Sequence, residues 1–207
     1  INGVESLEKY CLGGYYSILI GDMLRGRYCI VDKLGFGGYL TIWLALDTCQ
    51  HRYVAVIVGI AGSNSNEINI LRALAHPGHY SIPTPLDQFE LDGPNGIYLC
   101  YTITLARCNL REVSFSRLFP LKITRALSGG LTLAIAYMHP QGYVHGDIHL
   151  RNVLVRVPSN FDKLSVEQTY EEYGEPQTVS VARCDGMPLP LNIPAKAVAG
   201  VIVRVSC

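Results

Sequence analysis

The stretch YVHGDIHLRNVLV, residues 143–155, holds the side chains of this chain that are best suited to chemistry. Asp147 stands between His145 and His149, and Asn152 follows it five residues later. A carboxylate in such a loop can accept the proton of an attacking hydroxyl. An amide oxygen at that spacing can turn back and hold a magnesium ion on a phosphate. The pattern H-x-D-x-x-x-x-N therefore predicts a catalytic loop for phosphoryl transfer.

A metal site is the competing interpretation of the two histidines. His145 and His149 are four residues apart, which suits two zinc ligands on one face of a helix. Gly146 and the β-rich flanks argue against a helix here, and no third ligand is evident. The structural alternative for His145 is a buried histidine that bonds to the backbone and braces the loop.

Strands are expected in the first half of the chain, where β-branched and aromatic residues alternate with polar ones. The expected ranges are 27–35, 39–48 and 53–60, with two further strands around a Gly-Pro-Asn-Gly turn within 89–105. Residues 67–75 predict a helix. The sequence GFGG at 35–38 predicts a hairpin whose backbone can approach a ligand closely, because glycine has no Cβ.

The second half opens with a predicted helix at 121–139, which follows Pro120. This helix is apolar nearly all round, so we expect an exposed apolar patch of several hundred Å² that aggregates or binds a partner. The catalytic loop comes next, followed by a strand at 152–157. Residues 158–194 are polar and rich in proline, and we interpret them as an insertion or spacer without a core of its own.

The composition limits the class of protein. Hydrophobic residues make up 49% of the 207 residues and charged residues 16%, which predicts a folded core. Seventeen basic residues balance seventeen acidic ones, so no nucleic acid or membrane partner is expected. The seven cysteines include no C-x-x-C pair, which favours a reducing compartment, the cytoplasm or the nucleus.

The order of these segments is that of a protein kinase: glycine hairpin, Val-Ala-Val strand, helix with a Glu, two strands, long helix and Asp–Asn loop. Residues 10–47 also resemble the opening of the SR-protein-specific kinase family. That opening has Tyr-x-x-Gly-Gly-Tyr, Ile-Gly-Asp, Arg-Tyr and a glycine loop ending in Trp-Leu. The matching residues here are Tyr10, Gly13, Gly14, Tyr15, Ile20, Gly21, Asp22, Arg27, Tyr28, Trp43 and Leu44. The stretches GPNGIYLC and YVHGDIHLRNVLV look like fungal members of the group, and the resemblance covers about residues 10–195.

The resemblance implies a serine/threonine protein kinase that uses ATP and Mg²⁺ and acts on protein substrates, which in this family are Arg-Ser-rich. It implies an α+β, bilobal, protein-kinase-like fold with a complete β-rich N-lobe and an incomplete helical C-lobe. The expected division is an N-terminal extension at 1–26, an N-lobe at 27–106, a partial C-lobe with the catalytic loop at 107–157, and a spacer with an atypical tail at 158–207.

The resemblance also implies roles for individual residues. Asp147 would be the catalytic base, Asn152 a magnesium ligand, and His149 would stand where the kinase loop has a Lys that assists the phosphate. Glu67 would be the helix Glu that pairs with the strand Lys. The nucleotide would be held by Leu34, Gly35, Gly37, Ile42, Ala55, Ile103, Leu105 in the 104–106 hinge, and Leu154.

The chain departs from the family at four places. Ile57 replaces the strand Lys that holds the phosphates, and losing one preorganised donor costs about 10²–10³ in rate. No Asp-Phe-Gly or Ala-Pro-Glu follows Asn152. Leu40 stands where a small residue closes the glycine loop. His149 and Gly146 replace the usual Lys and Arg of the catalytic loop.

These departures predict that this chain is inactive or strongly impaired, as a truncated or misread gene product would be. The alternative is a pseudokinase fragment that binds a nucleotide or a protein, including a partner that covers the long helix. The His-Gly-Asp sequence also suggests a small-molecule kinase of the aminoglycoside phosphotransferase type, which the 10–47 element argues against.

Overall fold

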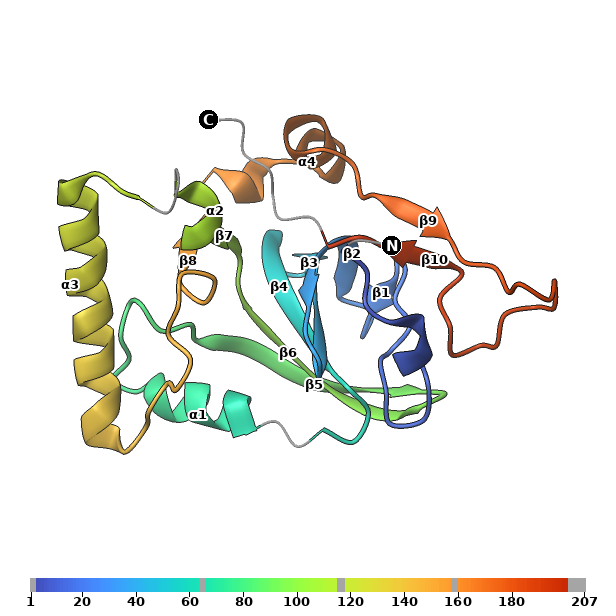
Figure 1. Ribbon diagram of the computed structural model, residues 1–207, viewed down its shortest axis with the longest axis horizontal. Coiled ribbons are helices and arrows are strands. Elements are labelled where there is room, and N and C mark those ends of the chain that lie inside the picture. The colour runs from blue at the N-terminus through green and yellow to red at the C-terminus, as the bar shows by residue number, and fades with distance from the viewer. Residues whose placement is uncertain (1–2, 64–65, 115–117, 158–159, 201–207) are drawn as a thin grey trace. The chain divides into compact units, whose positions relative to one another are not determined.

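The computed structural model describes residues 3–63, 66–114, 118–157 and 160–200 (Figure 1). They form two compact units, which are treated separately below. The sheet unit draws on residues 1–65, 86–105 and 158–207, and the helical unit on residues 66–85 and 106–157. The sheet unit is therefore assembled from three separate stretches of the chain.

A six-stranded sheet in the order β1-β2-β3-β4-β6-β5 forms the sheet unit. Its strands are β1 (Met23–Leu24), β2 (Tyr28–Phe36), β3 (Leu40–Asp47), β4 (Arg52–Gly59), β5 (Pro85–Gly93) and β6 (Gly96–Thr104). The strands predicted at 27–35, 39–48 and 53–60 are confirmed to within about a residue, and a pair of strands around the turn is confirmed as well. The two-residue strand β1 was not predicted, and β5 begins earlier than expected.

The two faces of the sheet follow from the strand register. Trp43 of β3 pairs with Val56 of β4, and the adjacent Ile42 pairs with Ile57, so these two pairs lie on opposite faces. The Trp43 face carries the main hydrophobic core. Its buried members are Ile18, Leu24, Tyr28, Ile30, Trp43, Ala45, Val54, Val56, Val58, Phe89, Tyr98, Cys100 and Val198. The Ile42 face also carries Gly35, Ala55 and Ile103, which the family resemblance assigns to the nucleotide.

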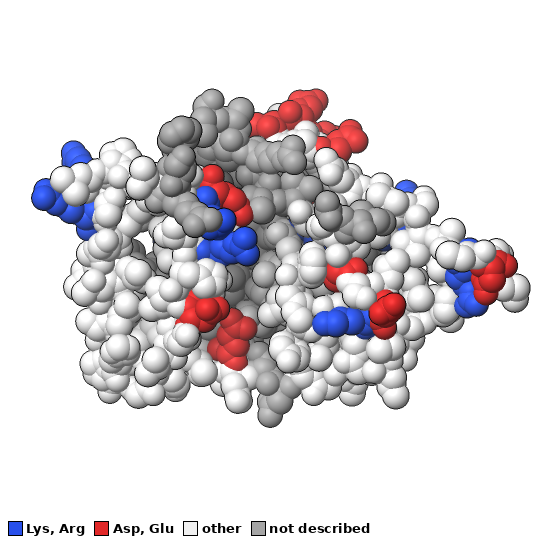
Figure 2. Space-filling view, viewed as in Figure 1, with Lys and Arg blue, Asp and Glu red and all other residues white. Residues whose placement is uncertain are grey.

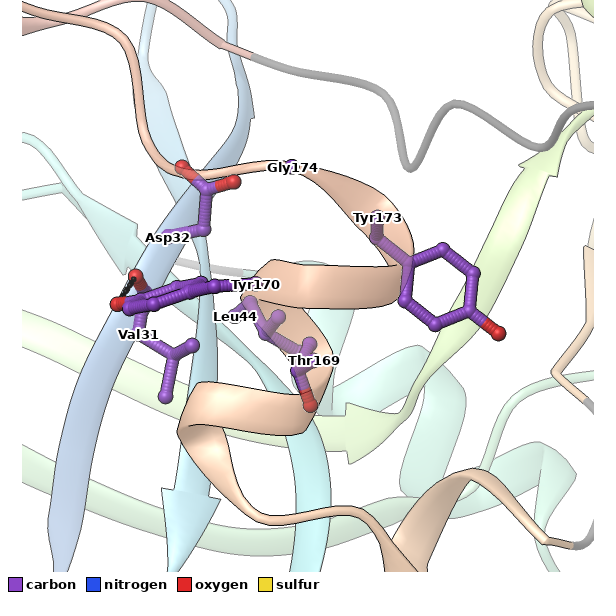
Figure 3. A pocket seen from close by; sticks show the side chains of 7 residues that line it. All are labelled: Val31, Asp32, Leu44, Thr169, Tyr170, Tyr173 and Gly174. Carbon is purple, nitrogen blue, oxygen red and sulfur yellow. Dashed lines mark hydrogen bonds between the residues drawn. The ribbon is translucent and has the colours of Figure 1, made fainter.

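The segment after residue 157 packs onto the sheet unit. It forms η3 (Phe161–Lys163), α4 (Val166–Tyr173) and a hairpin of β9 (Thr178–Ser180) with β10 (Lys196–Val198). Phe161 is buried, with its ring centroid 5.0 Å from that of Tyr53. The Tyr170 hydroxyl donates to the Val31 carbonyl of β2 at 2.8 Å, beside the Asp32 carboxylate (Figure 3). The predicted spacer has no separate core. Val198 joins the core on the Trp43 face, whereas Phe161 packs against Tyr53, which the register places on the Ile42 face.

The helical unit contains α1 (Asn66–Leu74), α2 (Leu110–Val113), α3 (Leu121–Met138) and η2 (His139–Gln141). Strands β7 (Ala106–Asn109) and β8 (Leu154–Arg156) pair antiparallel. The helices predicted at 67–75 and 121–139 are confirmed, whereas the strand predicted at 152–157 is shorter. The Tyr137 hydroxyl joins α3 to the end of α1, because it donates to the Leu74 carbonyl at 2.8 Å and accepts from the Gly78 N–H at 2.9 Å.

Helix α3 leaves most of its apolar surface uncovered. Ala134 is its one buried residue, and Leu121, Ile123 and Leu133 are exposed. Figure 2 shows charged side chains on this helix only near its beginning. An open cavity of about 300 Å³ lies between α3 and residues 148–153. Among the described residues, no helix is both long enough and apolar enough to cross a bilayer.

Candidate functional site

The predicted catalytic loop brings its polar side chains together. The Asn152 side-chain amide donates to the Asp147 carboxylate at 2.9 Å and to the Asp147 carbonyl at 3.0 Å. His149 Nε2 lies 3.5 Å from the second carboxylate oxygen. Gly146 has φ +76°, a left-handed conformation that favours glycine, and it turns the chain into the loop. The five-residue spacing read from the sequence thus produces direct contact between Asp147 and Asn152.

Exposure makes this loop usable for chemistry on an external group. The Asp147 side chain is 72% exposed, and its carboxylate can accept hydrogen bonds at free positions. The Asn152 amide, which donates to that carboxylate at 2.9 Å, orients it. The loop therefore presents an oriented, solvent-accessible carboxylate.

The prediction that His145 could be a buried brace is wrong in part. His145 is exposed, so it is no core histidine. It does bond to the backbone, since its Nδ1 accepts from the Asp147 N–H at 3.3 Å. His145 therefore supports the catalytic loop from the surface, without burial.

The sheet unit holds most of the residues assigned to the nucleotide. Gly35 pairs with Ile42, Ile42 with Ile57, and Ala55 with Ile103, so the register places all five on one face of the sheet. Leu34 precedes Gly35 in β2 at a register shift. Leu105 is buried directly after β6.

The glycine hairpin is open on the side that a ligand would approach. An ideal Cβ placed on Gly35 or Gly38 would meet no described atom within 4 Å. The nearest described atom to such a Cβ on Gly37 is a Leu40 side-chain carbon at 4.0 Å. The backbone at these positions can therefore be approached closely, which is what phosphate binding by a glycine loop requires.

Ile57 occupies the position from which the Lys of the kinase family would reach the phosphates. Its side chain is buried, at 4% exposure, on the face of Ile42 and Ala55. Lys33 of β2 cannot replace the missing amine, because it pairs with Trp43 and so lies on the opposite face. On this face of the sheet, neither Ile57 nor Lys33 therefore supplies the amine of the missing strand Lys.

The remaining predicted site residues lie in the helical unit. Glu67 is in the first turn of α1, and Leu154 begins β8 with 55% of its surface exposed. Asp147, His149 and Asn152 are in the loop before β8. The roles that the resemblance assigns to these residues stay predictions.

Sequence reasoning missed a buried polar cluster on the Trp43 face. The Lys33 ammonium forms an ion pair with the Glu5 carboxylate, which also accepts from the Tyr10 hydroxyl. The side chains of Lys33 and Glu5 are 1% and 3% exposed. Burial lowers the pKa of Lys33, and the Glu5 carboxylate offsets part of that effect. A charged pair 28 residues apart leaves no periodic signal in a sequence.

Comparison with known proteins places these features in a family. No family model matches the chain. It is 29% identical over 198 residues to SRSF protein kinase 3 of Sus scrofa, an alignment covering 86% of this chain and 35% of that protein. A serine/threonine protein kinase of Aspergillus fumigatus is 31% identical over 150 residues, covering 68% of this chain and 38% of that kinase. Protein kinase dsk1 of Schizosaccharomyces pombe is 32% identical over 166 residues, covering 73% of this chain and 30% of that kinase.

These relatives define the class as protein kinases, and the sheet-rich unit corresponds to a kinase N-lobe. Within that class the chain is a homologue of the SR-protein kinases, so the resemblance seen in residues 10–47 is confirmed. The chain spans about a third of the length of the relatives named here.

Proposed function

We propose that this chain carries the glycine hairpin and the catalytic loop of an ATP- and Mg²⁺-dependent serine/threonine protein kinase, and that the chain itself transfers phosphate poorly or not at all. The observation that carries the proposal is the hydrogen bond between Asn152 and Asp147, because it joins the expected magnesium ligand to the expected base. The substrate class is protein Ser and Thr hydroxyls. Arg-Ser-rich substrates are inferred from the names of the SRSF protein kinases.

The residues present fit bound ATP and Mg²⁺ only in part. The glycine hairpin offers a backbone that a phosphate can approach, although its Gly37 N–H already donates to the Leu40 carbonyl at 2.9 Å. Asn152 supplies an amide oxygen of the kind that Mg²⁺ accepts. Bound Mg·ATP would supply the phosphoryl group and the charge that activates it. Ile57 has no amine to hold those phosphates, so positioning is incomplete.

The chain's own part in the reaction is proton transfer and orientation. The exposed Asp147 carboxylate would accept the proton of the attacking hydroxyl, and Asn152 would hold that carboxylate in one orientation. His149 lies beside the same carboxylate and assists a phosphate only when it is protonated. Impairment is therefore assigned to the phosphate-holding side of the site.

The test compares binding of Mg·ATP by the chain and by Ile57→Lys and Ile57→Met variants, using isothermal titration calorimetry. We expect Ile57→Lys to bind at least about tenfold more tightly than the parent chain, because a charged donor contributes about 1.5–3 kcal/mol. Ile57→Met keeps the size without the charge and should bind like the parent.

A phosphotransfer assay on an Arg-Ser peptide then tests the base. In the Ile57→Lys background, Asp147→Asn should abolish transfer and leave the affinity for Mg·ATP within about threefold. Failure of both the parent chain and Ile57→Lys to bind Mg·ATP would refute a nucleotide site. Rapid transfer by the parent chain would refute the impairment.

A non-catalytic role as a protein-binding module is the second candidate. The exposed apolar residues of α3, with one buried residue in the whole helix, favour it. Light scattering distinguishes the two candidates at the first step. If the chain stays monomeric and its Ile57→Lys variant binds Mg·ATP no more tightly than the parent chain, neither candidate function is supported.

A further inference from the structure

The glycine hairpin is held by residues far away in the sequence. The Tyr15 hydroxyl donates to the Gly37 carbonyl at 2.6 Å. Tyr15 itself is buried, at 2% exposure, and its own carbonyl accepts from the Asn95 side chain and the Tyr98 hydroxyl. A hydroxyl fixed in this way can restrain the hairpin, because both its ring and its backbone are already anchored.

A second contact reaches the neighbouring hairpin residue, Phe36. The Lys33 ammonium lies 5.5 Å from the centre of the Phe36 ring and 5.1 Å from that of Trp43. Glu5 fixes the ammonium in place through the buried ion pair. Glu5 therefore acts on Phe36 only through Lys33, which belongs to the hairpin strand β2 itself.

The end of the inserted segment supplies a third contact, at Gly35. A Cβ built on Gly200 would lie 3.2 Å from the Gly35 Cα, so the two backbones pass close to each other. The Gly200 N–H donates to the Gly3 carbonyl at 2.8 Å, and the preceding Val198 belongs to the hydrophobic core. Gly200 is thus fixed by groups other than the hairpin.

These contacts leave the opposite side of the hairpin uncovered. A Cβ on Gly35 would meet no described atom within 4 Å, Gly200 included, so Gly200 approaches Gly35 from the other side. Gly37 is contacted by Tyr15 and Gly35 by Gly200, so each of the two distant segments, 5–15 and 196–200, meets one hairpin glycine.

We infer that Tyr15 and Gly200 are positioning residues, which hold the glycine hairpin in a ligand-ready shape from the side away from the nucleotide. The expected consequence, tighter binding of Mg·ATP, rests on the proposed function. The holding itself is a property of the free chain. Neither residue would touch the nucleotide, and both would act through Gly35 and Gly37.

The test measures amide hydrogen exchange of residues 35–40 in the absence of nucleotide, in the parent chain and in Tyr15→Phe. We expect exchange there to become about threefold to tenfold faster, which is the effect of losing one hydrogen bond. Exchange of β4 and the unfolding midpoint followed by Trp43 fluorescence should stay unchanged. Tyr16→Phe is the matched control, because it removes a hydroxyl from the adjacent residue.

Gly200→Ala tests the other contact by a different mechanism. The added methyl group would press on the Gly35 Cα at 3.2 Å, so we expect faster exchange at residues 35–40 here too. In the Ile57→Lys background, each variant should weaken Mg·ATP binding by about threefold to tenfold.

The two readouts separate failure of this inference from failure of the proposed function. Unchanged exchange in Tyr15→Phe and Gly200→Ala would overturn the inference, and so would faster exchange with unchanged affinity for Mg·ATP. Faster exchange in a chain whose Ile57→Lys variant binds no Mg·ATP supports the holding by Tyr15 and Gly200 and overturns the proposed function instead.

Discussion

Replacing Glu5 with Gln should destabilise the sheet unit strongly at neutral pH. Glu5→Gln keeps the size of the side chain and removes the charge that compensates the Lys33 ammonium, whose side chain is 1% exposed. Breaking a buried pair in this way costs about 3–5 kcal/mol, because one charge stays buried without its partner. The Gln carbonyl oxygen can still accept from the Lys33 ammonium but carries no charge, and the amide N–H group then faces the Tyr10 hydroxyl.

Proton release from Lys33 sets an upper limit on that cost. Deprotonating a Lys with an ordinary pKa near 10.4 costs about 4 kcal/mol at pH 7.5 and about 2 kcal/mol at pH 9, since each pKa unit is about 1.36 kcal/mol. Burial already lowers the pKa of Lys33 in the folded chain, so the neutral amine is accessible. We therefore expect Glu5→Gln to lose about 3–4 kcal/mol at pH 7.5 and about half as much at pH 9.

Urea unfolding followed by the fluorescence of Trp43 is the assay. Trp43 is the one tryptophan of the chain, is buried in the sheet core, and lies 5.1 Å from the Lys33 ammonium. The double variant Glu5→Gln with Lys33→Met removes both charges and should recover most of the loss. A loss under about 0.5 kcal/mol at pH 7.5, or a double variant as unstable as the single one, would show that the pair is not buried and coupled as described.

Two further changes test the packing of the inserted segment. Burial raises the pKa of Asp32 to about 6, so this carboxyl stabilises the fold below about pH 4 and that contribution is lost as the pH rises through 6. Asp32→Asn should accordingly match the parent near pH 4 and be more stable by about 1 kcal/mol at pH 8, after allowance for the partial exposure of the group; equal stability of the two chains at pH 8 contradicts this. Phe161→Ala empties a buried site against Tyr53 and should cost about 3 kcal/mol or more, seen as faster proteolysis within residues 160–174, whereas Lys163→Ala on the same turn should change stability by less than about 0.5 kcal/mol. Equal proteolysis of the two variants would show that Phe161 does not anchor the segment.

Local patterns account for the parts of the structure that the sequence could predict. The apolar alternation of β2, β3 and β4 places them within about a residue, because each strand is half or fully buried. The contact between Asp147 and Asn152 was also predictable, since a five-residue loop decides it. Helix α4 had a usable signal, as Ser165 and Gln168 form a capping box, but the proline-rich surroundings outweighed it.

Long-range contacts account for what could not be predicted. Charged residues such as Glu5 and Lys33 are ordinarily exposed, and nothing along the chain indicates that the two meet. The hydrogen bond from Tyr15 to Gly37 joins two motifs that were both recognised, but their mutual contact required the fold. His145 was assigned to a buried position by analogy, whereas the loop lies on the surface of the described helical unit.

The contact between Gly3 and Gly200 has a consequence for how the protein is made. The sheet unit combines residues from both ends of the described chain, and Val198 shares its core with Ile18. A chain emerging from the ribosome therefore holds an incomplete sheet core until about residue 200 is free, although the helical unit needs nothing beyond residue 157. Such distant pairings slow folding, because loop closure precedes the contacts that compensate for it. We expect the nascent sheet unit to be the part of this protein that most depends on chaperones during synthesis.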